Sequence, residues 1–165
     1  YDMSMNGSLR VVKTAATFVP PIDRAAARRE MFRRIVASWM LRNGDAHLKN
    51  FGLLYSSAAD VRLAPLYDVV TTTAYPSLRN DVPALSLEGR RAWRLKGGSW
   101  TRFASAHCAL EPAGAREIVD ALAESIAEES VHAERYGREH PQTAALIGAM
   151  VTQWKSGVQD VRAGM

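Results

Sequence analysis

The strongest hydrophobic pattern in the chain lies between residues 24 and 41. Five hydrophobic residues recur there at the i, i+3, i+4, i+7, i+8 spacing of one helical face: Phe32, Ile35, Val36, Trp39 and Met40. Asp23 stands where an N-cap is expected, and Asn43-Gly44 is a typical C-terminal stop. We therefore predict a long helix, with one buried face, between these two signals.

Two shorter patterns follow this helix. Residues 51–55 and 61–64 are β-prone, and the segment SSAAD (residues 56–60) between them predicts a hairpin with a five-residue loop. Because the two arms are of similar length, the chain should return to its starting point after the second arm. This geometry predicts a contact between Asn50 and Asp68.

The remaining chain is predicted mostly from turn and helix signals. We expect a turn at Asn6-Gly7, a strand-like run over residues 9–14, a short helical turn over 69–73 and a loop over 75–83. Glu88-Gly89 would turn a second strand pair, residues 84–87 and 92–95. Three further helices are expected: one capped by Ser99 and ending near His107, one opening at Pro112, and one opening at Pro141.

These elements predict one mainly α domain (α+β) over residues 1–165, with one or two small β-hairpins. The composition agrees, because 47% hydrophobic and 23% charged residues are ordinary values for a globular protein. No apolar run approaches the roughly 20 residues that a membrane helix needs. Cys108 is the single cysteine, which excludes an internal disulfide framework and favours a reducing cytoplasm. We expect Cys108 to be a small buried hydrophobe.

The net charge of +4 changes this picture little. The basic residues include two clusters: Arg28, Arg29, Arg33 and Arg34, then Arg90, Arg91, Arg94 and Lys96. Solvated faces are the favoured interpretation, with docking of an acidic partner or DNA as the alternative, so direct nucleic-acid binding is not expected. The four tryptophans fall at positions typical of a core or an interface.

Three oxygen-bearing side chains suggest chemistry. In a kinase catalytic loop an Asp receives the substrate proton, an Asn five positions later binds metal, and a later Asp is the other metal ligand. Asp45, Asn50 and Asp68 match this order and spacing. A carboxylate and an amide oxygen suit Mg²⁺.

Other interpretations of the same region remain open. Zinc held by Asp45, His47 and Asp68 is disfavoured because the set is poor in His, and metal-dependent hydrolysis is a minor alternative. Lys49 could pair with a phosphate or be a solvated charge. Tyr67 could lie near an adenine or pack in the core.

At these residues the chain resembles a known family. The stretches NGDAHLKNF (residues 43–51) and LAPLYD (residues 63–68) resemble the paired signature of HipA-family serine/threonine kinases. The resemblance implies a helical kinase C-lobe-like subdomain that uses ATP and Mg²⁺. By this resemblance Asp45 is the catalytic base, and Asn50 and Asp68 are the metal ligands. The implied nucleotide contacts are His47, Lys49 and Tyr67.

The resemblance also implies a cellular role. HipA-family kinases are toxins of toxin-antitoxin modules, act on aminoacyl-tRNA synthetases or other translation components, and are neutralised by a DNA-binding antitoxin. Complete members carry an N-terminal lobe with a phosphate-covering loop and an ATP-pairing Lys, and residues 1–21 provide neither. We therefore expect a fragment or a split kinase. The alternative is a non-catalytic module that binds an antitoxin or scaffold.

Overall fold

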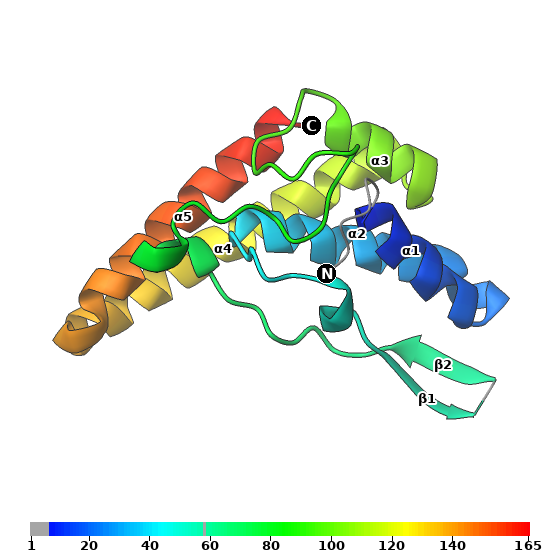
Figure 1. Ribbon diagram of the computed structural model, residues 1–165, viewed down its shortest axis with the longest axis horizontal. Coiled ribbons are helices and arrows are strands. Elements are labelled where there is room, and N and C mark those ends of the chain that lie inside the picture. Colours follow the sequence, from blue (N-terminus) through cyan, green and yellow to red (C-terminus); the bar gives the residue numbers. More distant parts are fainter. Residues whose placement is uncertain (1–6, 58) are drawn as a thin grey trace.

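The computed structural model describes residues 7–57 and 59–165, which form five α-helices and one two-stranded hairpin (Figure 1). This confirms the prediction of a mainly helical fold with a small hairpin. No helix among the described residues is long and apolar enough to cross a membrane. The helices are α1 Gly7–Phe18, α2 Arg24–Met40, α3 Ser99–His107, α4 Pro112–Glu139 and α5 Ala144–Ala163.

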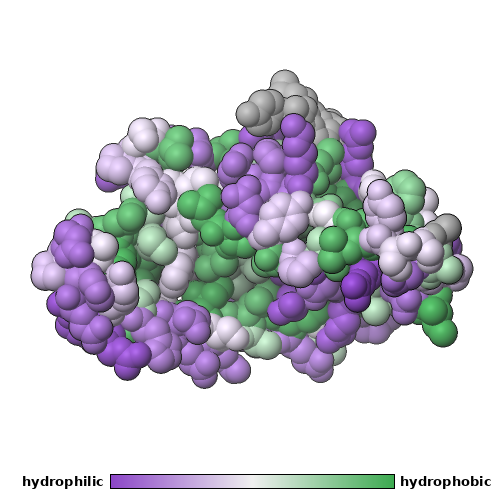
Figure 2. Space-filling view, turned by 90° about the horizontal axis from the view of Figure 1, so that it is seen from below, coloured by the Kyte–Doolittle hydropathy of each residue, from purple (hydrophilic) through white to green (hydrophobic). Residues whose placement is uncertain are grey.

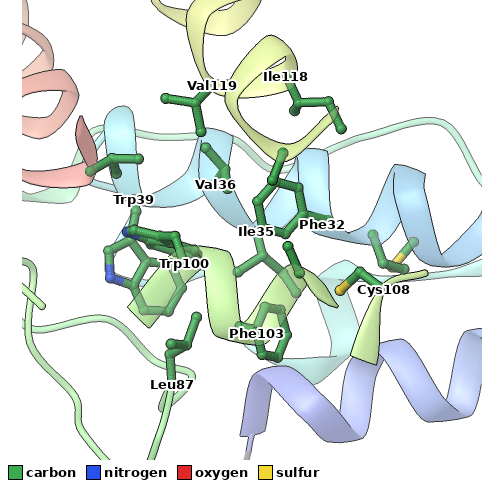
Figure 3. Packing of buried hydrophobic residues seen from close by; sticks show 14 of the residues in the cluster. Phe32, Ile35, Val36, Trp39, Leu87, Trp100, Phe103, Cys108, Ile118 and Val119 are labelled. Atoms are coloured by element: carbon green, nitrogen blue, oxygen red, sulfur yellow. The ribbon is translucent and has the colours of Figure 1, made fainter. Parts of the chain in front are cut away.

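Helix α2 lies at the centre of the core. All five residues of its predicted hydrophobic face are at most 2% exposed, which confirms that prediction. They pack with side chains from α3 and α4, among them Trp100 and Val119 (Figure 3). The Trp100 ring meets Phe32 and Trp39 edge-on, with centroids 6.3 and 5.5 Å apart, an arrangement that aromatic pairs favour.

Cys108 belongs to this core. Its side chain is fully buried, and burial raises the pKa of its thiol to about 12. The expectation of a small buried hydrophobe is confirmed.

The prediction of a strand over residues 9–14 is wrong, because this segment belongs to α1. Asn6 lies outside the described residues, and Gly7 begins the helix rather than a turn. The buried positions 11, 12, 15 and 16 follow a helical period, and they pack α1 against α2. The segment looked strand-like because Val11, Val12 and Thr14 are β-branched, a preference that packing against α2 overrides.

Helix α2 starts as expected but ends earlier than predicted. Asp23 precedes its first residue yet makes no side-chain capping bond. The helix ends at Met40 in a Schellman motif, where the Asn43 N–H donates to the Ser38 carbonyl (2.9 Å) and the Arg42 N–H to the Trp39 carbonyl (3.2 Å). Arg42 takes the left-handed position (φ 56°) that glycine usually occupies.

The predicted hairpin is confirmed, with β1 Leu53–Ser57 antiparallel to β2 Asp60–Leu63. Both strands extend into the predicted loop, so the turn is shorter than expected, and the register shifts between Tyr55 and Ser57. The hairpin projects from the helical body (Figure 1).

The second strand pair does not form among the described residues. Glu88 and Gly89 do turn the chain, both with positive φ, but the pairing is limited to one bridge between Leu87 and Arg90. Beyond that bridge, side chains rather than a strand ladder fix the segment. The Arg91 guanidinium donates to the Pro83 carbonyl (2.8 Å), and the Trp93 indole donates to the Asp81 carbonyl (2.7 Å).

The last three predicted helices are present. Helix α3 starts at Ser99 itself, which does not cap it; the Ser99 hydroxyl donates to the Glu88 carboxylate (2.6 Å). Helix α4 opens at Pro112, whereas Pro141 opens a 3-10 turn from which α5 continues. Helices α4 and α5 pack along each other (Figure 1). The helical turn expected over 69–73 is a 3-10 turn at Thr72–Ala74, and the expected loop after it contains another at Pro76–Leu78.

Candidate nucleotide and metal site

The loop that follows α2 is folded by its own polar side chains. The Asn43 side-chain oxygen accepts the Asp45 backbone N–H (3.1 Å), which forms a local turn. The Asn43 amide nitrogen donates to the Asp68 carbonyl (3.2 Å), 25 residues further along the chain. Asn43 therefore sets the backbone of Asp45 and ties it to the segment that carries Asp68.

Gly44 packs closely against the segment that carries Asp68 and Thr72. Its N–H donates to the Thr72 hydroxyl oxygen (2.9 Å), and the Thr72 hydroxyl donates to the Arg42 carbonyl (3.2 Å). A Cβ atom on Gly44 would lie 2.7 Å from that Thr72 oxygen. Any side chain at this position would therefore force the Thr72 hydroxyl to shift, which favours glycine between Asn43 and Asp45.

The hairpin returns the chain to the loop, as predicted. The Ala64 N–H donates to the Gly52 carbonyl (3.0 Å) at the base of the two strands. Four residues later the Asp68 carboxylate accepts a hydrogen bond of 2.6 Å from the Asn50 amide nitrogen. The predicted contact between Asn50 and Asp68 is confirmed.

The contact between Asn50 and Asp68 leaves oxygen atoms available for a cation. Asn50 is 4% exposed, and its side-chain oxygen is buried without a hydrogen-bond partner in residues 7–57 and 59–165. The bond from the Asn50 amide nitrogen to Asp68 fixes the orientation of that oxygen. Asp68 is exposed, and one of its carboxylate oxygens receives no hydrogen bond within the described chain. A buried amide oxygen beside a solvent-facing carboxylate fits the preference of Mg²⁺ for few protein ligands plus water and phosphate.

Asp45 is the solvent-exposed acidic residue of the loop. Its side chain is 57% exposed, so it can be reached by a substrate hydroxyl. His47 is less exposed, and its Nε2 atom lies 3.9 Å from the Asp45 carboxylate. No three His, Cys, Asp or Glu side chains in the described ranges converge to hold a metal ion. Asp45, His47 and Asp68 therefore do not make up the three-ligand zinc site considered above.

Tyr67, which precedes Asp68 in the returning segment, contacts the loop that follows α2. Its hydroxyl donates a hydrogen bond to the Lys49 carbonyl, and the residue as a whole is 43% exposed. Lys49 lies in the 3-10 turn Leu48–Asn50. Its side chain is exposed and forms no ion pair in the described chain. Tyr67 is therefore not packed in the core, and the Lys49 ammonium is accessible to a ligand. The roles predicted for both residues stay predictions.

Arg42 was not predicted as part of this region. Its buried guanidinium forms an ion pair with Asp160, donates to the Ser156 hydroxyl (2.9 Å) and lies over the Trp93 ring. Neither α5 partner is near Arg42 in sequence, so hydrophobic periodicity gives no signal for the contact. Asn43 had a weak signal in the sequence, since it is the first residue of the stretch 43–51 that resembles the family.

Comparison with known proteins gives one family and several relatives. A model of the HipA-like C-terminal domain matches residues 1–130. A Haemophilus influenzae protein named "Putative kinase" is 40% identical over 79 residues, which cover 46% of this chain and 23% of that protein. "Putative kinase Y4mE" of Sinorhizobium fredii is 36% identical over 91 residues, 52% of this chain and 21% of that protein. The chain thus spans less than a quarter of these curated relatives.

Proposed function

Because the chain belongs to the HipA-like C-terminal domain family, we propose that it is the catalytic half of a serine/threonine protein kinase. The reaction is transfer of the ATP γ-phosphoryl group to a Ser or Thr hydroxyl of a protein. The relatives named as kinases and the order Asp45, Asn50, Asp68 support this proposal.

Phosphoryl transfer depends mainly on alignment and charge, which the loop and the returning segment can supply. Asp45 acts as the base that accepts the proton of the acceptor hydroxyl, and its open position suits that role. Asn50 and Asp68 would hold Mg²⁺ through the oxygens described above. Bound Mg²⁺ neutralises negative charge on phosphate oxygens.

Three further residues are proposed nucleotide contacts. The exposed Lys49 ammonium would pair with a phosphate, and His47 beside Asp45 would donate to the nucleotide. The half-exposed ring of Tyr67 would lie against it, with its hydroxyl already engaged by the loop.

The observation that carries the proposal is the hydrogen bond between Asn50 and Asp68. It joins residues 18 positions apart, across a hairpin, and leaves a buried amide oxygen to which no residue of the described chain donates a hydrogen bond. Burying an unpaired polar atom has a cost of about 1–3 kcal/mol, so a site built in this way favours a ligand for that atom.

Calorimetry with ATP and Mg²⁺ tests the binding part of the proposal. We expect magnesium-dependent heat with the unchanged chain. Asp68→Ala should lose at least about tenfold in affinity, because one metal ligand and the partner of Asn50 are removed together. Asp23→Ala is the matched control, since this exposed carboxylate makes no capping bond. Equal affinities of Asp68→Ala and the control would contradict the proposed metal site.

Transfer of labelled phosphate tests the role of Asp45. In an assay that also supplies the expected N-terminal lobe, Asp45→Asn should lower transfer by about a hundredfold or more, because the amide cannot accept the proton. Binding of ATP and Mg²⁺ should remain, since Asp45 is not proposed as a metal ligand. Unchanged transfer by this variant would exclude Asp45 as the base.

A second candidate function is a non-catalytic binding module for an antitoxin or scaffold. It is favoured by the large hydrophobic side chains exposed on the hairpin and the segment after it, namely Leu54, Tyr55, Leu66, Tyr67 and Val69. Viewed from below, hydrophobic residues gather in the middle of this side of the molecule (Figure 2). A purely binding module would show no magnesium-dependent heat with ATP.

The cellular role rests on family resemblance alone. We propose a toxin that is neutralised by a DNA-binding antitoxin and that phosphorylates an aminoacyl-tRNA synthetase or another translation component. Growth arrest on expression, relieved by co-expression of the antitoxin and absent in Asp45→Asn, would support this role. Equal arrest by that variant would contradict a kinase toxin.

A further inference from the structure

One face of α5 contacts both segments that form the site. The contacting residues share a helical spacing of three to four positions and are Gln153, Trp154, Ser156, Gly157 and Asp160. All five lie beyond residue 130, where the family match ends.

On the Asp68 side, α5 holds the 3-10 turn and the residue before it. The Trp154 indole N–H donates to the Thr71 hydroxyl oxygen (2.7 Å), and the Thr73 hydroxyl donates to the Gln153 side-chain oxygen (3.1 Å). Thr71, Thr72 and Thr73 are each at most 5% exposed. Three consecutive buried hydroxyls need partners, and α5 supplies two of them.

On the loop side, α5 holds Arg42. Asp160 supplies the counter-charge for a guanidinium that is almost completely buried. The backbone of the same helix approaches the end of α2 so closely that a Cβ atom on Gly157 would lie 2.1 Å from the Met40 carbonyl oxygen. The α2 end that starts the loop is therefore seated on α5.

The contact with Arg42 is transmitted to the site by hydrogen bonds already described. The Arg42 carbonyl accepts the Thr72 hydroxyl, which in turn accepts the Gly44 N–H next to Asp45. Removing the charge of Asp160 would leave a buried cation without its counter-charge, and Arg42 would have to move to regain water. Its carbonyl would move with it.

From these contacts we infer that α5 is the positioning element of the site. Trp154 fixes the segment that carries Asp68, and Asp160 fixes the loop that carries Asp45 and Asn50. Both are positioning residues, because their side chains bond to Thr71 and Arg42, which are not among the residues proposed to bind metal or nucleotide. This inference rests on the proposed function only in what the site binds, and its structural part can be measured without any ligand.

Amide hydrogen exchange of the full chain, followed by NMR without nucleotide, tests the inference. Asp160→Asn should speed exchange of the Gly44 amide, and Trp154→Phe should speed that of Ala74, which bonds to the Thr71 carbonyl. We expect about fivefold changes, the effect of one lost hydrogen bond on local opening. Lys155→Ala is the control, because Lys155 forms an exposed ion pair with Glu134 of α4.

A double-mutant cycle distinguishes positioning from general loosening. Thr71→Val and Trp154→Phe remove the same hydrogen bond, so the double variant should exchange at Ala74 no faster than either single variant. Asp160→Glu keeps the charge and should restore slow exchange at Gly44. Equal acceleration of core amides such as Val36, or unchanged exchange at both site amides, would overturn the inference.

Nucleotide binding then separates this inference from the proposed function. If the unchanged chain binds ATP with Mg²⁺, both α5 variants should weaken that binding about tenfold, whereas Lys155→Ala should not. Absence of magnesium-dependent binding by the unchanged chain would reject the proposed function, and the exchange data would still decide the role of α5.

Discussion

Asp68 and Arg42 both hold the left-handed backbone conformation, with φ of 56°. This conformation has a cost of about 1–2 kcal/mol for a residue with a side chain, and it is often retained where function needs it. At Asp68 the carboxylate meets the Asn50 amide. At Arg42 the chain leaves α2 while its guanidinium reaches Asp160. Among the described residues, four non-glycine positions have a positive φ. Two of them, Arg42 and Asp68, belong to the proposed site and its supporting loop, whereas Glu88 and Ala109 are not part of it.

Gly44 provides a test at the scale of one residue. Gly44→Ala should destabilise the fold by about 1–3 kcal/mol, because the new Cβ displaces the Thr72 hydroxyl from its bond with Gly44. Chemical denaturation measures the change. Gly97→Ala is the control, since its Cβ would lie 3.9 Å from the Ala163 carbonyl oxygen, an ordinary contact. A Gly44→Ala stability equal to that of the control would contradict the tight contact.

Cys108 provides a pH-dependent test. Its pKa is raised to about 12 by burial, from an ordinary value of 9.0, so the folded state retains a proton that the unfolded state loses. Stability should therefore be unaffected below about pH 9 and should fall as the pH rises from 9 toward 12. Denaturation at pH 8 and pH 10 should show a smaller decrease in Cys108→Ala than in the unchanged chain. Identical decreases would contradict the buried thiol.

At the scale of elements, α2 and the hairpin position the site, and α5 supports both sides of it. Helix α5 crosses the end of α2 at Gly157, where backbone meets backbone. Gly157→Ala should therefore destabilise the protein by about 3 kcal/mol despite the better helix propensity of alanine. Gly148→Ala, in the same helix with open space around it, should instead stabilise by up to about 1 kcal/mol. Thermal unfolding compares the two, and equal effects would contradict the close crossing.

The sequence predicts those elements whose signals are long or local. The five-residue hydrophobic face located α2, and the similar arms of the hairpin predicted the contact between Asn50 and Asp68. The first helix was missed because its β-branched residues, Val11, Val12 and Thr14, favour a strand when packing is not considered. The end of α2 was placed too late because Arg42 occupies a position where glycine is expected.

The support of the site by α5 could not be predicted. Trp154 and Thr71 are 83 residues apart, and Arg42 and Asp160 are 118 apart. Their residue types are ordinary for an amphipathic helix and a buried turn, so no local pattern distinguishes them. Such contacts depend on how the helices pack, which periodicity does not specify.

At the scale of the whole molecule, the chain is a body of packed helices, and the proposed site lies at its surface. The proposed base and one proposed metal ligand, Asp45 and Asp68, are both exposed, and hydrophobic side chains continue from the site along the hairpin. Seen from below, hydrophilic residues dominate toward the end where α4 and α5 join (Figure 2). A longer protein, of which curated relatives are examples, would have this hydrophobic side available for a further lobe.

The most direct test of the account locates the metal. With Mn²⁺ in place of Mg²⁺ and with ATP present, paramagnetic broadening in the NMR spectrum should be strongest for the amides of Asn50, Phe51 and Asp68. Amides in the middle of α4, such as Ile126, should stay sharp. The Asp68→Ala variant should lose the selective broadening. Broadening centred on another acidic region, or unchanged in Asp68→Ala, would contradict a magnesium-nucleotide site at Asn50 and Asp68.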